Sequence, residues 1–409
     1  MKQVFLIRLF IAAKDKNLIV MMVGVGVLRM IAGKLLVIGL LCMSLTSCTF
    51  GDKSTYLQDD FISTAEIIKI QIDSQHDSIP VQSMVSSYEL VLLEASKQSI
   101  LSNIDQLLLT DQYIIVSDSH QIDQIYAFNH DGSFSHSIGR KGRGPGEYIH
   151  PTDITIKDSC LVVLDMFSHQ ILYYEFGGKF LKSESYSDKI HEIEAYGAEI
   201  LAYAGDNRHN RRIRNYEFLV LNADNTVKSA AFYNPYSMNY NTGKNINSIG
   251  DELYFSRALL PCVCEYDTRR GLYAKYVLEL SPNPLPANFE QTCHGDYANF
   301  MNLYRGNYTY YSGIFWGTDR YLSFNVESRG KRYLFLKDKV TDASYLSPVE
   351  IRANCGTDKT MTNLIYWLAN PYAVKENCIY SVVDSELLFL FDREPDSESN
   401  PAILKMYLK

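Results

Sequence analysis

The sequence has 409 residues, of which 46% are hydrophobic and 21% charged, which is an ordinary globular composition with enough apolar material for a large core. It contains 30 tyrosines but only 2 tryptophans, and an excess of aromatic residues favours strands. The formal net charge of −8 argues against nucleic acid as a partner, because such partners require a positive surface.

The first 47 residues predict a secretory signal peptide. They hold six basic residues and one acid, and their apolar run, Leu35 to Leu45, is too short to span a bilayer. The run ends in LTSC, which resembles the bacterial lipobox, so we expect the thiol of Cys48 to be acylated, for example with palmitate. Met30 is an alternative start, because a complete signal follows it. A signal anchor or a plain transmembrane helix is the alternative interpretation.

Removal of residues 1–47 leaves 33 basic and 46 acidic residues, a net charge of −13. We expect residues 48–65 to form a polar tether and the lipid to hold the protein in the outer membrane. Acidic residues soon after the lipidated cysteine mark export to the cell surface. Asp52 is the only acid in the first few positions after Cys48, so the periplasmic and the surface-exposed orientation both remain open.

The mature chain contains a repeat of about 46 residues. The segments 113–139 and 161–185 each alternate strand and turn signals, and they share a Gln-Ile pair, a glycine and a phenylalanine at matching positions. A period of 40–50 residues with about four strands per unit is typical of a propeller blade. Four weaker units follow, at 190–233, 245–280, 313–346 and 363–392.

These units predict an all-β fold, a six-bladed β-propeller over residues 66–409. A propeller must join its first and last blades, because open sheet edges aggregate. We therefore expect the segments 88–94 and 401–409 to lie side by side in the closing sheet. Residues 67–73 alternate and predict a further strand, whereas apolar residues at helical spacing over 287–304 predict a short helical insertion on one face.

The segment SIGRKGRGPGEYIHPTDI, residues 137–154, contains four glycines and three cations. It lacks the ending that a P-loop requires, and strand signals rather than a βαβ unit surround it, so we interpret it as a connector between two blades. With IYAFNHDGSF before it and NPAILKMYLK at the C-terminus, it resembles the six-bladed β-propeller lipoproteins of Bacteroidota, which are similar to NHL-repeat propellers. The resemblance implies an exported, lipid-anchored propeller, and it implies no particular activity.

The candidate ligand-binding residues come from this connector and from the inner strands. Its cations could hold an anionic group through charge-assisted hydrogen bonds, or they could be a solvated loop with an internal ion pair. Two histidines precede predicted inner strands and could face the channel mouth. The candidates are Arg140, Lys141, Arg143, Glu147, His150 and His191. The aromatic run 304–317 is either a stacking platform or core.

The sequence contains no recognisable catalytic or metal motif. It has neither G-x-S-x-G nor H-E-x-x-H, and the cysteines of PCVC (261–264) have no second pair to complete a zinc set. We expect the cysteines of the mature chain to be buried or paired thiols, and no cofactor is evident. The favoured function is a binding module for a glycan, a peptide or an envelope protein. The alternative is a hydrolase or lyase at the channel mouth that uses His150, His191 and a divalent cation.

Overall fold

The computed structural model describes residues 64–73, 76–205, 213–236, 238, 243–352, 359–393 and 399–409. The predicted signal peptide, Cys48 and Cys355 lie outside these ranges. No helix within them is long and apolar enough to cross a membrane.

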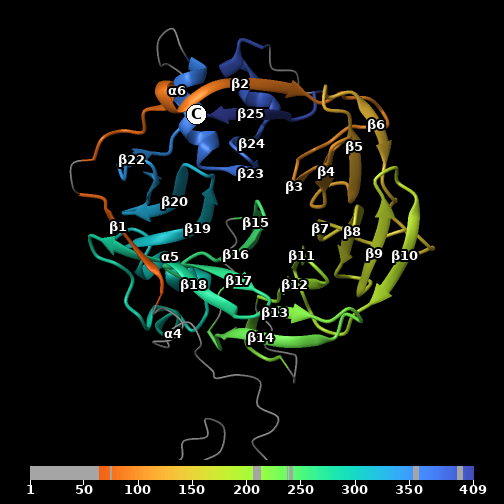
Figure 1. The fold of residues 1–409 in the computed structure, drawn as a ribbon, viewed down its shortest axis with the longest axis horizontal. Helices are drawn as coiled ribbons and strands as arrows, with labels where there is room; N and C mark the ends of the chain where they lie inside the picture. The colour runs from red at the N-terminus through yellow and green to blue at the C-terminus, as the bar shows by residue number, and fades with distance from the viewer. Residues whose placement is uncertain are drawn as a thin grey trace, which may run out of the picture. The chain divides into compact units, whose positions relative to one another are not determined.

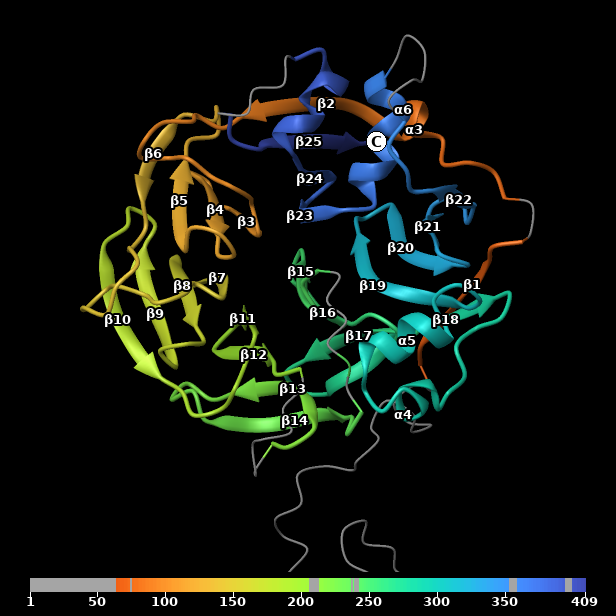
Figure 2. The ribbon, with the colours of Figure 1, turned by 180° about the vertical axis from the view of Figure 1, so that it is seen from behind.

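The described strands form six small antiparallel sheets arranged around a central axis, as predicted (Figure 1, and from behind in Figure 2). Blade 1 contains β3 (Gln106–Leu109), β4 (Ile114–Asp118), β5 (Gln124–Phe128) and β6 (Phe134–Ser137). Blade 2 contains β7 (Asp153–Lys157), β8 (Cys160–Asp165), β9 (Gln170–Glu175) and β10 (Phe180–Ser185). Blade 3 contains β11 (Glu192–Tyr196), β12 (Glu199–Tyr203), β13 (Tyr216–Leu221) and β14 (Val227–Tyr233).

The later blades carry additional elements. Blade 4 contains β15 (Ile246–Ile249), β16 (Glu252–Ser256), β17 (Cys262–Asp267), β18 (Gly271–Ser281) and, at its outer edge, the parallel strand β1 (Glu66–Gln71). Blade 5 contains β19 (Thr309–Gly317), β20 (Tyr321–Ser328), β21 (Lys331–Asp338) and β22 (Ser344–Pro348). Blade 6 contains β23 (Pro371–Lys375), β24 (Cys378–Val383), β25 (Ala402–Leu408) and β2 (Val85–Leu92).

The innermost strands of the blades, β3, β7, β11, β15, β19 and β23, surround the axis (Figure 1). All of them begin on one side of the ring, at which the chain crosses from the outer strand of one blade to the inner strand of the next. We call this side the crossing face. Apolar side chains of neighbouring blades pack between the sheets; for example, Ile115 and Ile125 of blade 1 lie in one cluster with Leu161 and Val163 of blade 2.

The predicted closure of the ring is confirmed. Strand β2 pairs antiparallel with β25, and Val85 lies opposite Leu408. Between β1 and β2 the chain forms a bridge from Asp77 to Tyr345 in blade 5 and then the short helix α3 (Val81–Met84). The N-terminal segment therefore runs along the outer edges of three successive blades.

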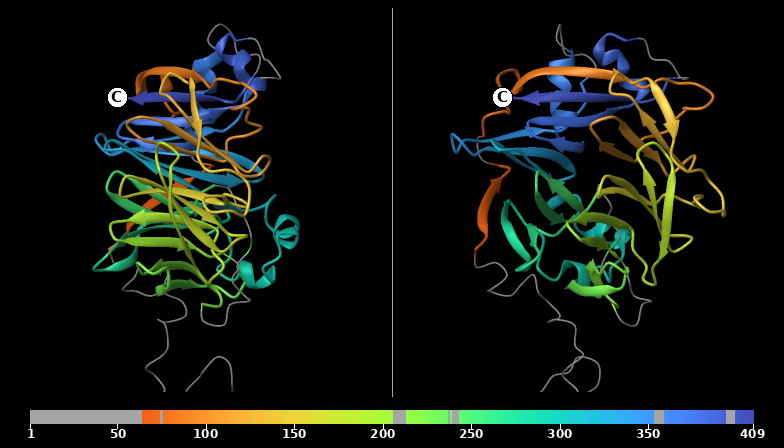
Figure 3. Two further views of the ribbon diagram at one scale, coloured as in Figure 1. Left: turned by 90° about the vertical axis from the view of Figure 1, so that its right-hand side faces the viewer. Right: turned by 45° about the vertical axis from the view of Figure 1, so that its right-hand side comes forward.

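The helical insertion is confirmed, but it consists of two helices, α4 (Phe289–Thr292) and α5 (Tyr297–Leu303). The chain turns between them because His294 and Gly295 have φ angles of 54° and 67°. The insertion projects on the side of the ring opposite the C-terminus, which is the crossing face (Figure 3). The buried Arg257 guanidinium attaches it to the propeller, with Nε 2.7 Å from Glu217 and Nη1 3.0 Å from Glu290 of α4.

The last predicted unit, 363–392, does contribute to the sixth blade, but it supplies only the two inner strands β23 and β24. Helix α6 (Lys359–Leu368) extends into its beginning, and the 3-10 helix η2 (Ser385–Phe391) occupies its end. Leu364, Trp367 and Leu368 follow helical spacing, and each is fully buried between blades 5 and 6. The two outer strands of blade 6 come from opposite ends of the chain instead.

Candidate functional site

The glycine-rich segment connects β6 of blade 1 to β7 of blade 2, so its interpretation as a blade-to-blade connector is confirmed. Gly139 (φ 65°) lies against Tyr148 and Tyr174, and Gly146 (φ 72°) lies against Phe180 of the outer strand β10. A Cβ atom at either glycine would come within 2.6–2.8 Å of these rings, so both positions require glycine. The loop is therefore held against the outer strands of blade 2.

Arg140 and Glu147 close this loop on itself. The guanidinium Nη2 and Nε atoms lie 2.6 and 2.7 Å from Glu147 Oε1, and the backbone N–H of Gly144 donates to Oε2 at 2.8 Å. These hydrogen bonds, first that of Gly144 and then that of Arg140, lower the pKa of Glu147. Arg140 thus has an internal partner, and Arg143 is exposed on the same loop.

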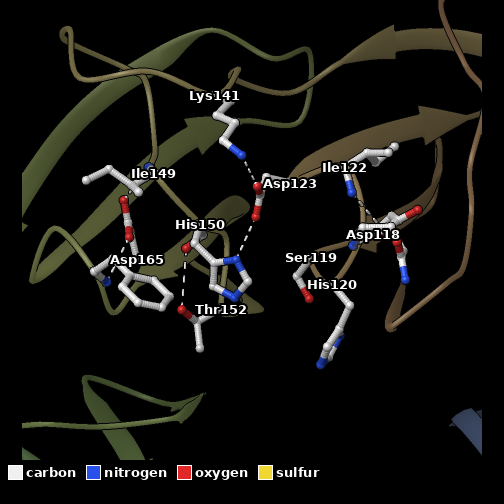
Figure 4. Close-up of polar contacts among 12 residues, drawn as sticks. Asp118, Ser119, His120, Ile122, Asp123, Lys141, Ile149, His150, Thr152 and Asp165 are labelled. Carbon is white, nitrogen blue, oxygen red and sulfur yellow. Dashed lines mark hydrogen bonds and ion pairs between the residues drawn. The ribbon is translucent and has the colours of Figure 1, made fainter.

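Lys141 and His150 meet at Asp123, in the turn between β4 and β5 (Figure 4). The Lys141 ammonium contacts one carboxylate oxygen, and His150 Nδ1 lies 2.6 Å from the other. Burial would raise the pKa of Asp123, but hydrogen bonds from Lys141 and His150 outweigh burial and lower it. The exposed ring of Phe167 packs edge-on against the imidazole, with 5.2 Å between ring centroids. The carboxylate therefore orients the imidazole at the junction of blades 1 and 2.

His191 lies one blade further along the ring, next to Glu192 at the start of β11. Its backbone N–H donates to Tyr203 at 2.8 Å, and its ring lies near Gly205. The two histidines thus occupy successive blades, each with its own neighbours. In the part of the chain that the structure describes, no group of three His, Cys, Asp or Glu side chains could hold a metal ion.

The central cavity of the propeller has a volume of about 670 Å³ and is lined by residues of the inner strands of all six blades. Apolar side chains of blades 1, 2 and 5, such as Leu108, Ile156 and Ile314, form one part of its wall. Polar groups of blades 3 and 4 form another part, namely Glu194, Lys244, Asn247 and Ser248. None of the six candidate residues from the connector and the strand starts lines this cavity.

The polar wall is organised around Lys244, just before β15. Its ammonium lies 2.9 Å from Glu194 and 3.6 Å from the buried carboxylate of Asp153, and Ser248 donates to the other Glu194 oxygen at 2.9 Å. Burial would lower the pKa of Lys244, but the two carboxylates outweigh burial and raise it. Lys244 therefore stays charged and is no candidate for an amine nucleophile.

Two carboxylates behind this wall join neighbouring blades. Asp153 begins β7 and accepts the backbone N–H of Ile193 at 2.6 Å, and Glu192 begins β11 and accepts that of Asn245 at 2.6 Å. Burial raises the pKa of Asp153 to about 6, and burial together with the Asp153 charge raises that of Glu192 to about 7. One ammonium is thus shared by more carboxylates than it can neutralise.

Sequence reasoning missed this wall, although one signal was available. An acidic residue stands at the start of two inner strands, Asp153 in PTDITI and Glu192 in HEIEAY. Lys244 could not be assigned, because nothing in the order of residues shows that it reaches back to the two preceding blades.

The cysteines of the described chain are free thiols, and Cys262, Cys264, Cys293 and Cys378 are buried, in agreement with one of the two expected states. The sulfur atoms of Cys262 and Cys264 lie 3.5 Å apart. The aromatic run 304–317 is core, because Tyr310, Tyr311 and Trp316 are almost completely buried.

The sequence matches the family DUF4934, described as a domain of unknown function, over residues 65–407. A "Putative exported protein" from Bacteroides fragilis has a similar crystal structure, with a TM-score of 0.67 and 16% identity over 84% of this chain and 99% of that chain. A DUF4221 family member from Bacteroides vulgatus matches with a TM-score of 0.46 and 10% identity, over 79% and 98% of the two chains. Virginiamycin B lyase from Staphylococcus aureus matches with 0.38 and 11%, over 79% and 100%. No curated protein matches the sequence.

Proposed function

This chain belongs to the DUF4934 family, and we propose that it is an exported, lipid-anchored propeller that binds a small polar ligand in its central cavity. The cavity of about 670 Å³ carries the proposal, because it combines apolar walls with a few convergent polar groups. The signal-like N-terminus with Cys48 supports export and anchoring, and the name of the Bacteroides fragilis protein agrees with export.

The geometry favours the cavity over the connector as the ligand site. Arg140 and Lys141 already contact Glu147 and Asp123, so an anion would have to displace a carboxylate from each. In the cavity, Ser248 and Asn247 donate to Glu194 and to the Lys244 carbonyl, which orients them, and as neutral groups they can still accept hydrogen bonds from a ligand. Rigid polar groups on strands orient a ligand without a large cost in conformational entropy.

The experiment compares two substitutions of the same kind at two places. Ser248→Trp puts an indole into the cavity, whereas Ser183→Trp puts one on the outer strand β10. Mass spectrometry of small molecules extracted from protein purified from membranes should find a ligand with the wild type and with Ser183→Trp, but not with Ser248→Trp. Equal retention by all three proteins would contradict binding in the cavity. In parallel, Cys48→Ala should abolish labelling by an alkyne-bearing palmitate.

A further inference from the structure

The cavity contains an excess of negative charge at its crossing-face end. Asp105 and Glu194 line it, and the buried carboxylates of Asp153 and Glu192 lie directly behind. Lys244 is the cation between them. Carboxylates in a region of low dielectric repel one another strongly, so this end favours a ligand that brings positive charge.

An acceptor without a donor lies at the same end. The side-chain amide nitrogen of Gln106 donates to the Asp153 carboxylate, which fixes the orientation of the amide. Its carbonyl oxygen Oε1 is buried and has no hydrogen-bond partner in the described structure. A buried acceptor without a donor is costly, and its partial negative charge adds to that of the carboxylates behind the cavity wall.

Tyr372 provides an aromatic surface on the opposite side of the cavity. It belongs to β23 of blade 6, three blades away from Glu194 on β11 of blade 3. The side chain is 39% exposed, yet burial and then the charges of Asp384 and Asp105 raise its pKa to about 12. Such a ring is accessible within a concave site, remains neutral and can stack on a cation.

We propose that the cavity binds an organic cation, with an ammonium group between the face of Tyr372 and the carboxylate of Glu194. This proposal rests on the proposed function, because it names the class of ligand for the same cavity. An anionic ligand is disfavoured because acids outnumber cations around the cavity. Four acids line it, namely Asp105, Glu194, Asp251 and Glu376, and the carboxylates of Asp153 and Glu192 lie behind, against the ammonium groups of Lys244 and Lys375 and the imidazole of His120, which is 2.9 Å from Asp105.

Binding of a cation should release protons from the protein. Asp153 and Glu192 face each other. The other groups near them are Lys244 before β15, Glu194 on β11, Tyr203 on β12, and the neutral amides of Gln106 on β3 and Asn245. With pKa values of about 6 and about 7, the two carboxyls are partly protonated near neutral pH. A positive charge nearby lowers both values, so protons leave on binding and the affinity rises from pH 5 to pH 8.

The test uses the full chain in detergent and three probes of similar shape and different charge. They are choline, its uncharged carbon analogue neohexyl alcohol, and the anion tert-butylacetate. We expect choline to bind at least tenfold more tightly than the alcohol, the anion not to bind, and calorimetry in two buffers at pH 6.5 to detect proton release with choline only. Because choline carries a permanent charge, any proton released comes from the protein.

Variants separate the ring from the charge. Tyr372→Phe should keep choline binding, whereas Tyr372→Leu should weaken it roughly three- to thirtyfold. Glu194→Gln, which preserves shape, should reduce the preference of choline over the alcohol. Unchanged thermal midpoints would show that these variants fold.

The outcomes distinguish this inference from the proposed function. If the alcohol or the anion binds as tightly as choline and Ser248→Trp abolishes that binding, the cavity is a ligand site but the proposal of a cationic ligand is wrong. If choline does not bind at millimolar concentration, or if calcium binds in its place, the proposal of an organic cation as the ligand is also wrong. If Ser248→Trp leaves the binding of all probes unchanged, binding in the cavity itself is contradicted.

Discussion

The chain crosses from the outer strand of one blade to the inner strand of the next. The side chains that stabilise this crossing differ between blades 1 and 2 on the one hand and the junction of blades 5 and 6 on the other. In blade 2, the buried carboxylate of Asp165 accepts the backbone N–H groups of Ile149, Phe167 and Ser168 at 2.7–3.1 Å. Asp118 accepts equivalent bonds in blade 1, at 2.8 Å from Ser102 and 3.1 Å from Gln121. A single carboxylate therefore accepts the hydrogen bonds of the backbone N–H groups at a short crossing.

The crossing into blade 6 uses a helix instead. The last carbonyl groups of α6 accept hydrogen bonds from side chains of both neighbouring blades: Trp316 Nε1 donates to Leu368 at 2.7 Å, and Ser381 donates to Trp367 at 2.8 Å. The Trp367 ring fills the space between the blades. The comparison teaches that a short crossing depends on one charged side chain, whereas a long one depends on apolar volume.

Trp367→Ala should therefore have the largest effect on stability. Removal of a fully buried indole leaves a cavity between blades 5 and 6 and should lower the free energy of unfolding by about 3–5 kcal/mol. Urea unfolding measures this loss, and Trp367→Phe should lose clearly less. Equal losses for the two variants would show that volume is not what α6 contributes.

Asp165→Ala should have the next largest effect, a loss of about 2–3 kcal/mol, because three backbone N–H groups lose their acceptor. Asp118→Ala is the matched variant and should lose a similar amount, since its bonds are equivalent. The same unfolding measurement applies. A large loss for one aspartate and none for the other would contradict the equivalence of the two blades.

Arg140→Ala should have the smallest effect, less than about 1 kcal/mol, because exposed ion pairs contribute little. The side chain is 78% exposed, and the glycine contacts of the connector remain. Thermal unfolding at low and high salt should detect almost no difference from the wild type. A loss comparable to that of Asp165→Ala would mean that the ion pair, not the glycines, holds the loop.

The same comparison explains what could be predicted from the sequence. Blades 1 and 2 were predictable because Asp118 and Asp165, with the Gln-Ile pairs that follow them, recur at nearly one period. The segment 363–392 was not, because its apolar residues suit a strand or a helix, and only packing between two blades selects the helix. Ring closure was predictable from terminal strands that lacked partners.

The candidate site was less predictable than the fold. His150 and Lys141 were identified, but their partner Asp123 belongs to the preceding blade, 27 residues from the histidine. Asp153, Glu192 and Lys244 come together only when three blades are placed around the axis. A short segment of sequence contains no information about such a juxtaposition.

The pairing of β2 with β25 also constrains how the chain folds. Ser86 donates to the carbonyl of Tyr407, 321 residues later, so the last blade cannot form until β25 has been synthesised. Contacts between such distant residues slow folding, and meanwhile β2 presents an unpaired edge. Removal of residues 402–409, which include β25, would leave β2 without a partner and β24 paired only with β23. The ring thus completes its hydrogen bonding only when its C-terminal strand has been made.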